Sequence, residues 1–204
     1  MNYYIDIKLY PDEEVPLYFI RNKVYTKLHK ALHDLDQTKI GVSFPDCIKY
    51  EKKGGVVFSG KLGKLIRLHG HQKDLQALQD SNWLGGLSGY CEIGDILPIP
   101  EKIEGYRIVS RKQTTMTLKK LEKRVAYQKA KGVLKTEEDI KNYERQYKAK
   151  MFASGLDNPY LELQSASNGH HYRVFIEIGD VLDNPVSGDF NYFGLSKTAT
   201  IPWF

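Results

Sequence analysis

The order of strand-like and helix-like segments in the first hundred residues restricts the fold more than any other feature. Apolar and polar side chains alternate over residues 3–9, which predicts a strand with one buried face. The later patterns predict a helix at about 16–33, strands at 40–44 and 62–69, a helix at 72–83 and a closing strand at 90–93. This order, β-α-β-β-α-β, is the split-βαβ order of a ferredoxin-like domain.

A second unit is predicted after Pro98 and Pro100, which mark a boundary. The patterns of this part indicate a strand at 106–111, a helix at about 117–131, a charged helix from about Thr136, and strands at 161–164 and 172–178. The segment from Phe190 to Phe204 is rich in glycine and aromatic residues, and we expect it to pack back on the body.

Positive charge is concentrated in this second unit. Residues 107–151 hold 14 Lys and Arg against 5 Asp and Glu, a net charge of +9, whereas the 16 basic and 20 acidic residues elsewhere sum to −4. Such a segregated positive charge favours a polyanion, and nucleic acid is the first candidate. Arg111 and Gln113, just before the basic helix, carry side chains that can form paired hydrogen bonds with base edges.

The basic helix has two faces on a helical wheel. The cationic stripe contains Lys120, Lys123, Arg124, Tyr127 and Lys131. The narrower apolar stripe contains Leu118, Leu121 and Val125, and we expect it to dock on a core. The predicted fold class is therefore α+β, with an N-terminal ferredoxin-like (RRM-like) domain at 1–100 and a C-terminal α/β domain at 101–204 that carries a basic RNA-binding helix at about 117–131.

The rest of the composition points to a cytoplasmic protein. The N-terminal segment alternates polar and apolar residues and contains acidic side chains early, so we expect no signal peptide. No apolar run approaches the roughly 18 residues that a membrane span needs, and we expect no membrane partner. Cys47 and Cys91 lack metal-ligand spacing and are typical of buried thiols in a reducing compartment.

Histidines offer two possible chemistries. His29 with His33, or His69 with His71, has the spacing of a metal-binding pair, but neither pair has an evident third ligand, so we expect no metal and no other cofactor. Metal-free RNA cleavage requires less, because the ribose 2′-hydroxyl attacks its own phosphodiester and the protein only positions groups and moves protons.

Histidine suits that proton transfer because its unperturbed pKa, about 6.5, is near cellular pH. His29 is also typical of an ordinary helix histidine beside a buried stripe. The polar turn at 165–169 has the composition to hold a ribose or phosphate, and equally that of a simple hairpin loop. The residues alone thus indicate an RNA-binding protein and leave nuclease activity open.

Nine segments along the chain carry a resemblance to a known family. In order they read YIDI (4–7), KLHKAL (27–32), IGVSFPD (40–46), WLGGL (83–87), YRIVSRKQ (106–113), SASNG (165–169), YRVFI (172–176), FGLSK (193–197) and IPWF (201–204). Together they resemble the repeat-processing endoribonuclease of type I-F CRISPR systems, with the region 132–158 the least similar.

The resemblance implies an enzyme that binds the hairpin of each CRISPR repeat and cuts the precursor RNA on the 3′ side of the stem without metal. Its products would carry 2′,3′-cyclic phosphate and 5′-hydroxyl ends. It also implies that the protein stays on the hairpin it has cut and joins the other subunits of the type I-F surveillance complex. The alternative is a catalytically silent subunit that binds the hairpin without cutting it.

The resemblance also assigns roles to individual residues. His29 would be the general acid and base, and Ser165 would hold the attacking hydroxyl. The RNA-binding residues would be Arg111 and Gln113 on base edges, Lys119, Lys120, Lys123 and Arg124 on phosphates in the major groove, and Tyr172 stacked on the closing base pair.

Two positions depart from the family pattern. The family often has a tyrosine that helps to orient the histidine where this chain has Phe193, so either Tyr192 substitutes for it or that hydrogen bond is absent. Tyr127 and Gln128 stand where the family helix has basic residues. Because lysine is a point charge and arginine a bidentate fork, the lysine-rich helix would fix its register in the groove less sharply.

Overall fold

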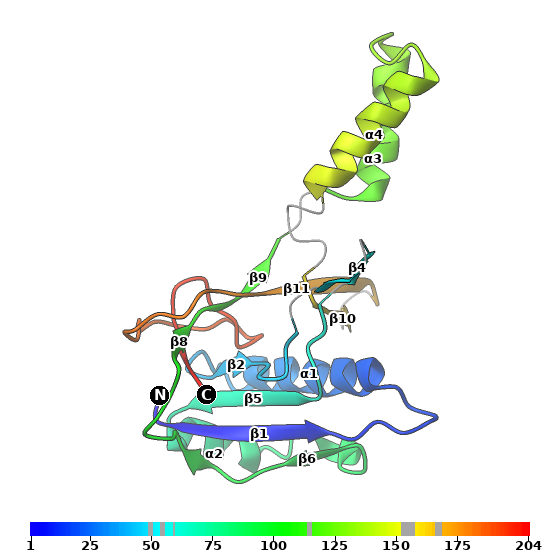
Figure 1. The fold of residues 1–204 in the computed structure, drawn as a ribbon. Helices are drawn as coiled ribbons and strands as arrows, with labels where there is room; N and C mark the ends of the chain where they lie inside the picture. The colour runs from blue at the N-terminus through cyan, green and yellow to red at the C-terminus, as the bar shows by residue number, and fades with distance from the viewer. Residues whose placement is uncertain (49–50, 54–55, 59, 114–115, 152–157, 166–168) are drawn as a thin grey trace.

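The computed structural model describes residues 1–48, 51–53, 56–58, 60–113, 116–151, 158–165 and 169–204 (Figure 1). Its helices are α1 (Leu17–Asp34), α2 (Gln72–Asp80), α3 (Leu118–Ala130) and α4 (Glu137–Met151), with a short 3-10 helix, η1, at Gly85–Leu87. Its strands are β1 (Tyr3–Leu9), β2 (Gly41–Ser43), β3 (Glu51–Lys53), β4 (Val56–Phe58), β5 (Leu65–Gly70), β6 (Cys91–Ile93), β7 (Leu97–Pro98), β8 (Gly105–Arg107), β9 (Val109–Lys112), β10 (Tyr160–Gln164), β11 (His171–Ile178) and β12 (Ile201–Trp203). The predicted α+β class is confirmed.

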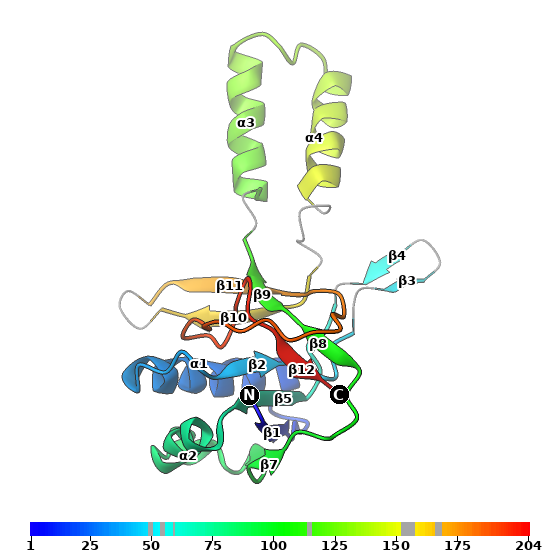
Figure 2. The ribbon, with the colours of Figure 1, turned by 90° about the vertical axis from the view of Figure 1, so that its left-hand side faces the viewer.

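The largest sheet has the strand order β2-β5-β1-β6, and β7 also pairs with β1. All its pairings are antiparallel. Ile5, Ile7 and Leu9 are buried, as their alternation in the sequence predicts, because α1 and α2 pack on one face of this sheet (Figure 2). On α1 the buried positions follow helical spacing and include Ile20, Val24 and Leu28, so the face of the helix was correctly predicted.

Helix α1 also has a layer on its other side. Strand β10 contacts it, and the backbone N–H of Glu162 donates to the side-chain oxygen of Asn22 at 3.2 Å. Strand β10 belongs to a three-stranded sheet of order β10-β11-β9. One apolar cluster joins the two halves of the chain and contains Ile5 and Leu28 together with Leu161.

The predicted single strand at 106–111 is wrong in one respect. The structure divides it into β8, which pairs with β12, and β9, which pairs with β11. The pairing switches at Ile108, whose carbonyl accepts from the N–H of Gly179 at 2.9 Å instead of from a ladder partner. Because of this switch, Arg107 and Arg111 belong to different sheets.

Helices α3 and α4 form an antiparallel pair that projects from the body (Figures 1 and 2). The predicted helix at 117–131 is confirmed as Leu118–Ala130, with the Thr117 side chain accepting from the N–H of Lys120. Its apolar stripe does not reach the main core. Leu121 and Val125 pack against α4 in a separate cluster with Tyr147, while Leu118 is 55% exposed, because only the partner helix covers this stripe.

Two further observations concern the helices. The predicted helix at 72–83 ends at Asp80, shortly before Asn82 adopts a left-handed backbone with φ of 45°. Within the described residues, no helix combines the length and the apolar character that crossing a membrane requires.

Candidate active site

His29 lies near the C-terminal end of α1 and is half-buried. Its neighbour Leu28 is fully buried, which fixes the helix face and leaves the imidazole at the edge of the core. The imidazole stacks on the ring of Phe193, with ring centroids 3.8 Å apart and an interplanar angle of 7°. The stacking restricts rotation of the imidazole and sets the plane in which its nitrogens point.

A backbone carbonyl determines which nitrogen of His29 carries the proton. Nδ1 lies 2.8 Å from the carbonyl oxygen of Tyr192. Because a carbonyl oxygen only accepts, Nδ1 is the donor. In the neutral imidazole Nε2 is therefore unprotonated and able to take a proton, and in the imidazolium it is able to give one. This is the arrangement that a general base and acid requires.

The Tyr192 carbonyl orients His29 although residue 193 is a phenylalanine and carries no hydroxyl. Neither side chain at 192 or 193 supplies a hydroxyl to His29: the backbone of Tyr192 accepts the hydrogen bond, and Phe193 stacks on the ring. The hydroxyl of Tyr192 instead donates to Asp36 at 2.5 Å. That hydrogen bond to the Asp36 carboxylate raises the pKa of Tyr192.

The segment that carries this carbonyl is held to the body on two sides. The hydroxyl of Tyr25, one turn before His29 on α1, donates to the carbonyl of Phe193 at 2.5 Å. Burial raises the pKa of Tyr25, which keeps this hydroxyl a donor. The N–H of Val42 on β2 donates to the carbonyl of Gly194 at 2.8 Å. The orientation of His29 therefore depends on contacts from two separate elements.

Substitution of Gly194 tests this dependence. Gly194 has φ of +67°, and a Cβ there would lie 2.2 Å from Cγ2 of Val42. We expect Gly194→Ala to lower the free energy of unfolding by about 1–3 kcal/mol and to slow any reaction that needs His29, because the alanine displaces the Tyr192 carbonyl. Denaturant unfolding measures the first effect. Gly86→Ala is the control, because a Cβ at Gly86 meets nothing within 4 Å; an equal loss in both variants would contradict the account.

Three residues predicted to act in catalysis or base reading share one cavity. His29, Arg111 and Gln113 line a cavity of about 250 Å³. Its remaining lining comes from Asn191, Tyr192, Phe193, Leu195, Ser196 and Lys197. Ser196 ties this segment to β9, because its N–H donates to the carbonyl of Val109 at 3.0 Å. The side chains of Arg111 and Gln113 form no hydrogen bond or ion pair within the described part of the chain.

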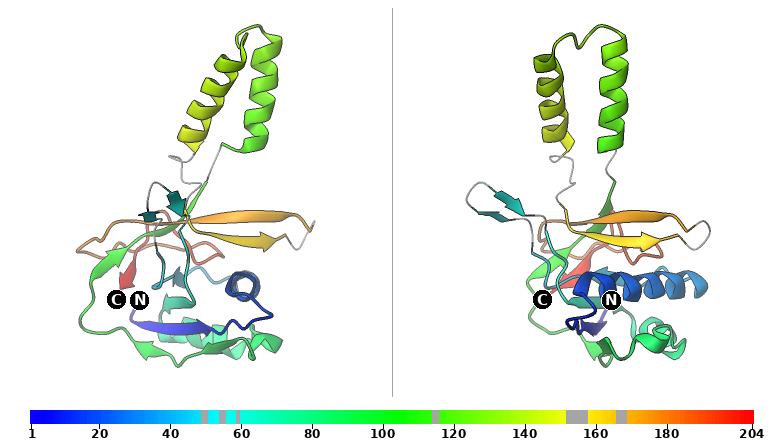
Figure 3. Two further views of the ribbon diagram at one scale, coloured as in Figure 1. Left: turned by 45° about the vertical axis from the view of Figure 1, so that its right-hand side comes forward. Right: turned by 90° about the vertical axis from the view of Figure 1, so that its right-hand side faces the viewer.

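Ser165 directly follows β10 and is not among the residues that line this cavity. Its N–H donates to the carbonyl of His170, and its carbonyl accepts from the N–H of Gly169, both at 2.9 Å. Residues 166–168 of the predicted turn lie outside the described residues. Strand β10 and helix α1 run in the same direction, so their C-terminal ends lie on the same side of the molecule (Figure 3).

The predicted RNA-binding residues outside the cavity lie on α3 and β11. The cations are all exposed on α3: Lys119, Lys120, Lys123 and Arg124. The guanidinium of Arg124 lies 5.6 Å from the ring centre of Tyr147 on α4, so this cation also links the two helices. Tyr172 on β11 is half-buried and packs against the main core, which leaves only part of its ring accessible.

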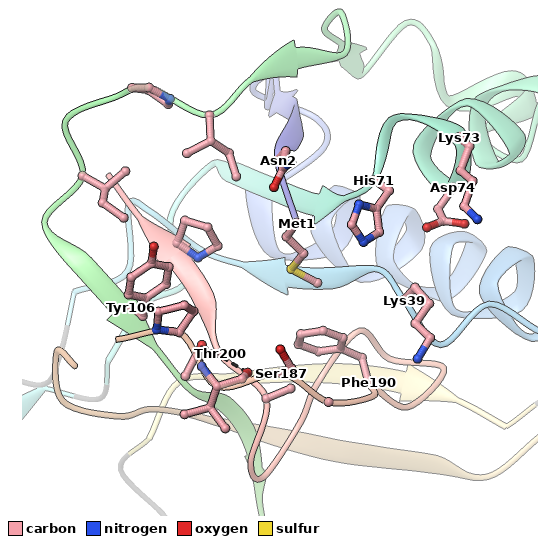
Figure 4. A pocket seen from close by; sticks show the side chains of 18 of the residues that line it. Met1, Asn2, Lys39, His71, Lys73, Asp74, Tyr106, Ser187, Phe190 and Thr200 are labelled. Carbon is pink, nitrogen blue, oxygen red and sulfur yellow. Dashed lines mark hydrogen bonds between the residues drawn. The ribbon is translucent and has the colours of Figure 1, made fainter. Parts of the chain in front are cut away.

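A larger cavity of about 840 Å³ lies elsewhere and contains none of the predicted site residues (Figure 4). Lys39, Lys73 and Asp74 lie at one end of it and Tyr106 at the other. Its charged side chains have both signs, and Lys39 is paired with Asp189. A polyanion therefore finds no uniformly positive surface there.

The histidine pairs do not assemble a metal site in the described part of the chain, where no group of three or more potential ligands occurs. His69 is fully buried, and burial lowers its pKa to about 3. Its Nε2 lies 2.8 Å from the hydroxyl of Ser43, which leaves it in a structural contact. The exposed His71 lies at the start of α2, beside the larger cavity.

Sequence reasoning did not assign roles to Tyr25 or Lys197, and for Tyr192 it considered the side chain, whereas the backbone carbonyl is what contacts His29. Tyr25 and Tyr192 act through contacts that join residues more than 160 positions apart, and no local pattern indicates these contacts. The conspicuous FGLSK segment at 193–197 was the available indication, since it contains Lys197 and directly follows Tyr192.

Comparisons with known proteins point to one family. A family model described as CRISPR-associated protein (Cas_Csy4) matches residues 4–204. A CRISPR-associated endonuclease Cas6/Csy4 from Escherichia coli (strain UTI89 / UPEC) is 37% identical over 204 residues, which is all of both chains. A CRISPR-associated endonuclease Cas6/Csy4 from Pseudomonas aeruginosa (strain UCBPP-PA14) is 34% identical over 205 residues, again covering all of both chains.

Proposed function

The chain belongs to the Cas6/Csy4 family of CRISPR-associated endonucleases, and we propose that it cuts CRISPR precursor RNA on the 3′ side of each repeat hairpin without a metal ion. The observation that carries the proposal is the orientation of His29, whose Nδ1 donates to the Tyr192 carbonyl in a cavity that also contains Arg111 and Gln113. A base-reading pair beside an oriented histidine suits sequence-specific cleavage.

The proposed reaction is an internal transesterification. The ribose 2′-oxygen forms a bond with the adjacent phosphorus, and the bond from phosphorus to the 5′-oxygen of the next nucleotide breaks. Nε2 of His29 takes the proton of the 2′-hydroxyl, and the imidazolium then gives a proton to the leaving 5′-oxygen. The products are a 2′,3′-cyclic phosphate and a 5′-hydroxyl.

Ser165 is proposed to hold the attacking 2′-hydroxyl. The position of Ser165 relative to His29, counted along β10 and α1, supports this role. Asn22 and Glu162 are in contact, Ser165 lies three strand residues beyond Glu162, and His29 lies seven helical residues beyond Asn22. Both advances are about 10 Å, because a strand rises about 3.3 Å and a helix 1.5 Å per residue. Figure 3 shows that β10 and α1 run in the same direction, so these two advances bring Ser165 and His29 to a similar height along the axis of α1.

Helix α3 is proposed to grip the phosphates of the hairpin. It follows β9 within a few residues, so a stem held along α3 leads to Arg111 and the cavity. The projection of α3 and α4 from the body leaves the exposed lysines of α3 open to a nucleic acid (Figure 1). Tyr172 is proposed to stack on the closing base pair. The body, with its β2-β5-β1-β6 order, is proposed to be a ferredoxin-like platform at 1–100.

Arg111 is expected to read a base near the foot of the stem. Arg111→Ala should cost about 1–3 kcal/mol of discrimination at one base pair, because a bidentate guanidinium contact is lost there. Binding to hairpins with each stem pair exchanged in turn measures this. Lys120→Ala is the matched comparison, since the loss of a phosphate contact weakens binding to all hairpins alike and reduces the salt dependence of binding. Uniform weakening by Arg111→Ala would contradict the base-reading role.

One incubation separates the proposed enzyme from a catalytically silent hairpin-binding subunit. The protein is mixed with labelled repeat hairpin RNA in EDTA, and the product ends are identified. Cleavage at the 3′ side of the stem, with cyclic phosphate and 5′-hydroxyl ends, is the expected result. Tight binding without a cut would favour the silent subunit. We further propose that the product hairpin stays bound and that the protein joins other type I-F subunits in the cytoplasm.

A further inference from the structure

Lys197 is a cation of the His29 cavity that has no role in the proton transfers and base contacts of the proposed reaction. It lines the cavity together with His29 and Arg111. Its side chain is exposed and forms no hydrogen bond or ion pair within the part of the chain that the structure describes. By contrast, Lys112 on the neighbouring strand β9 is paired with Glu177 at 2.6 Å. Lys197 is therefore available to an anion that enters the cavity.

The backbone just before Lys197 is fixed to the body. Ser196 is buried, its N–H donates to the carbonyl of Val109, and its hydroxyl oxygen accepts from the N–H of Ala199 at 2.9 Å. Val109 begins the strand that carries Arg111 two residues later. The backbone of Lys197 is thus held next to the strand that carries the proposed base-reading residue, so binding does not have to order this backbone.

The proposed reaction needs a cation beside the scissile phosphate. When the 2′-oxygen bonds to phosphorus, negative charge accumulates on the two non-bridging oxygens of the phosphate. His29 moves protons, and Arg111 is committed to a base edge. A lysine ammonium beside the non-bridging oxygens stabilises that charge more in the transition state than in the ground state, which lowers the barrier.

We propose that the Lys197 ammonium contacts a non-bridging oxygen of the scissile phosphate and acts as a catalytic residue. This inference rests on the proposed function. In this role Lys197 transfers no proton, so it adds no step to the proton transfers of His29. Its effect is electrostatic and appears in the rate of the chemical step rather than in hairpin affinity.

Lys197→Met tests the proposal, because methionine keeps an unbranched chain and removes the charge. Single-turnover cleavage is measured with protein in excess over hairpin RNA, and affinity is measured with a hairpin whose attacking nucleotide is 2′-deoxy. We expect the rate to fall about 100- to 1,000-fold with affinity changed less than about threefold, and Lys197→Arg to recover most of the rate. Lys73→Met, in the larger cavity, is the control and should keep the full rate.

A second readout distinguishes a phosphate contact from a structural role. Sulfur is substituted for each non-bridging oxygen in turn, giving two diastereomers. Sulfur at the oxygen that Lys197 contacts should slow cleavage by the native protein. The same substitution should slow cleavage by Lys197→Met to a smaller extent. An unchanged rate in Lys197→Met, an equal loss of rate and affinity, or identical sulfur effects in both proteins would overturn the proposal. Full activity of His29→Ala would instead contradict the proposed function.

Discussion

Replacing His29 with alanine is expected to slow hairpin cleavage by about 100- to 10,000-fold while leaving hairpin affinity within about threefold. The imidazole is the proton-transfer group held with a defined tautomer in the cavity, because Nδ1 donates to the Tyr192 carbonyl and Phe193 stacks on the ring. Affinity should persist because the lysines of α3 and the guanidinium of Arg111 supply the proposed RNA contacts from other elements.

The rate is measured under single-turnover conditions in EDTA, and affinity is measured separately. His71→Ala is the matched control, since His71 is an exposed histidine beside the larger cavity and contacts nothing in the His29 cavity. It should cleave at the native rate. If His29→Ala lost affinity in step with activity, the residue would be a binding or folding residue, and its assignment as acid and base would be wrong.

Replacing Arg67 with alanine is expected to lower the free energy of unfolding by about 3–5 kcal/mol. Arg67 is 8% exposed and forms two hydrogen bonds with the Asp6 carboxylate, at 2.6 and 3.0 Å. It also donates to the carbonyl of Phe204 at 2.7 Å and lies over the rings of Tyr4 and Phe204. Its removal leaves the Asp6 carboxylate without its partner and removes one of the contacts that hold residue 204 to the sheet.

Denaturant unfolding measures this effect. Lys148→Ala is the comparison, because Lys148 and Glu144 form an exposed i,i+4 pair on α4 that contributes less than about 0.5 kcal/mol. The double variant Asp6→Asn with Arg67→Met should recover part of the loss, since no unpaired charge remains. A cost for Arg67→Ala no larger than that of Lys148→Ala would show that the pair is not needed for stability.

The elements that sequence reasoning located correctly are those whose patterns are local. The alternation over residues 3–9 and the helical spacing of Ile20, Val24 and Leu28 each place one face in the core, so burial follows from periodicity. The division at Ile108 could not be predicted in this way. It depends on a hydrogen bond from Gly179, a residue about 70 positions away, and nothing in the pattern of residues 106–111 indicates it.

In the candidate site, too, some residues could be predicted from the sequence and others could not. His29, Arg111 and Gln113 were identified from residue types and a family resemblance, and the fold brings them to one cavity. The partner of His29 was not identified, because a backbone carbonyl is present at every position and has no sequence signature. Leu121 and Val125 of the predicted apolar stripe on α3 do pack inward, whereas Leu118 does not, and periodicity could not distinguish their partner α4 from the main core.

In the proposed reaction the RNA supplies its own nucleophile, which His29 activates in the cavity beside Arg111 and Gln113. The most direct test is a repeat hairpin with a single 2′-deoxy nucleotide on the 5′ side of the scissile phosphate, incubated with the native protein in EDTA. We expect unchanged affinity and no cleavage at that phosphate. Cleavage of the deoxy substrate would require an external nucleophile and would show that the proposed reaction is wrong.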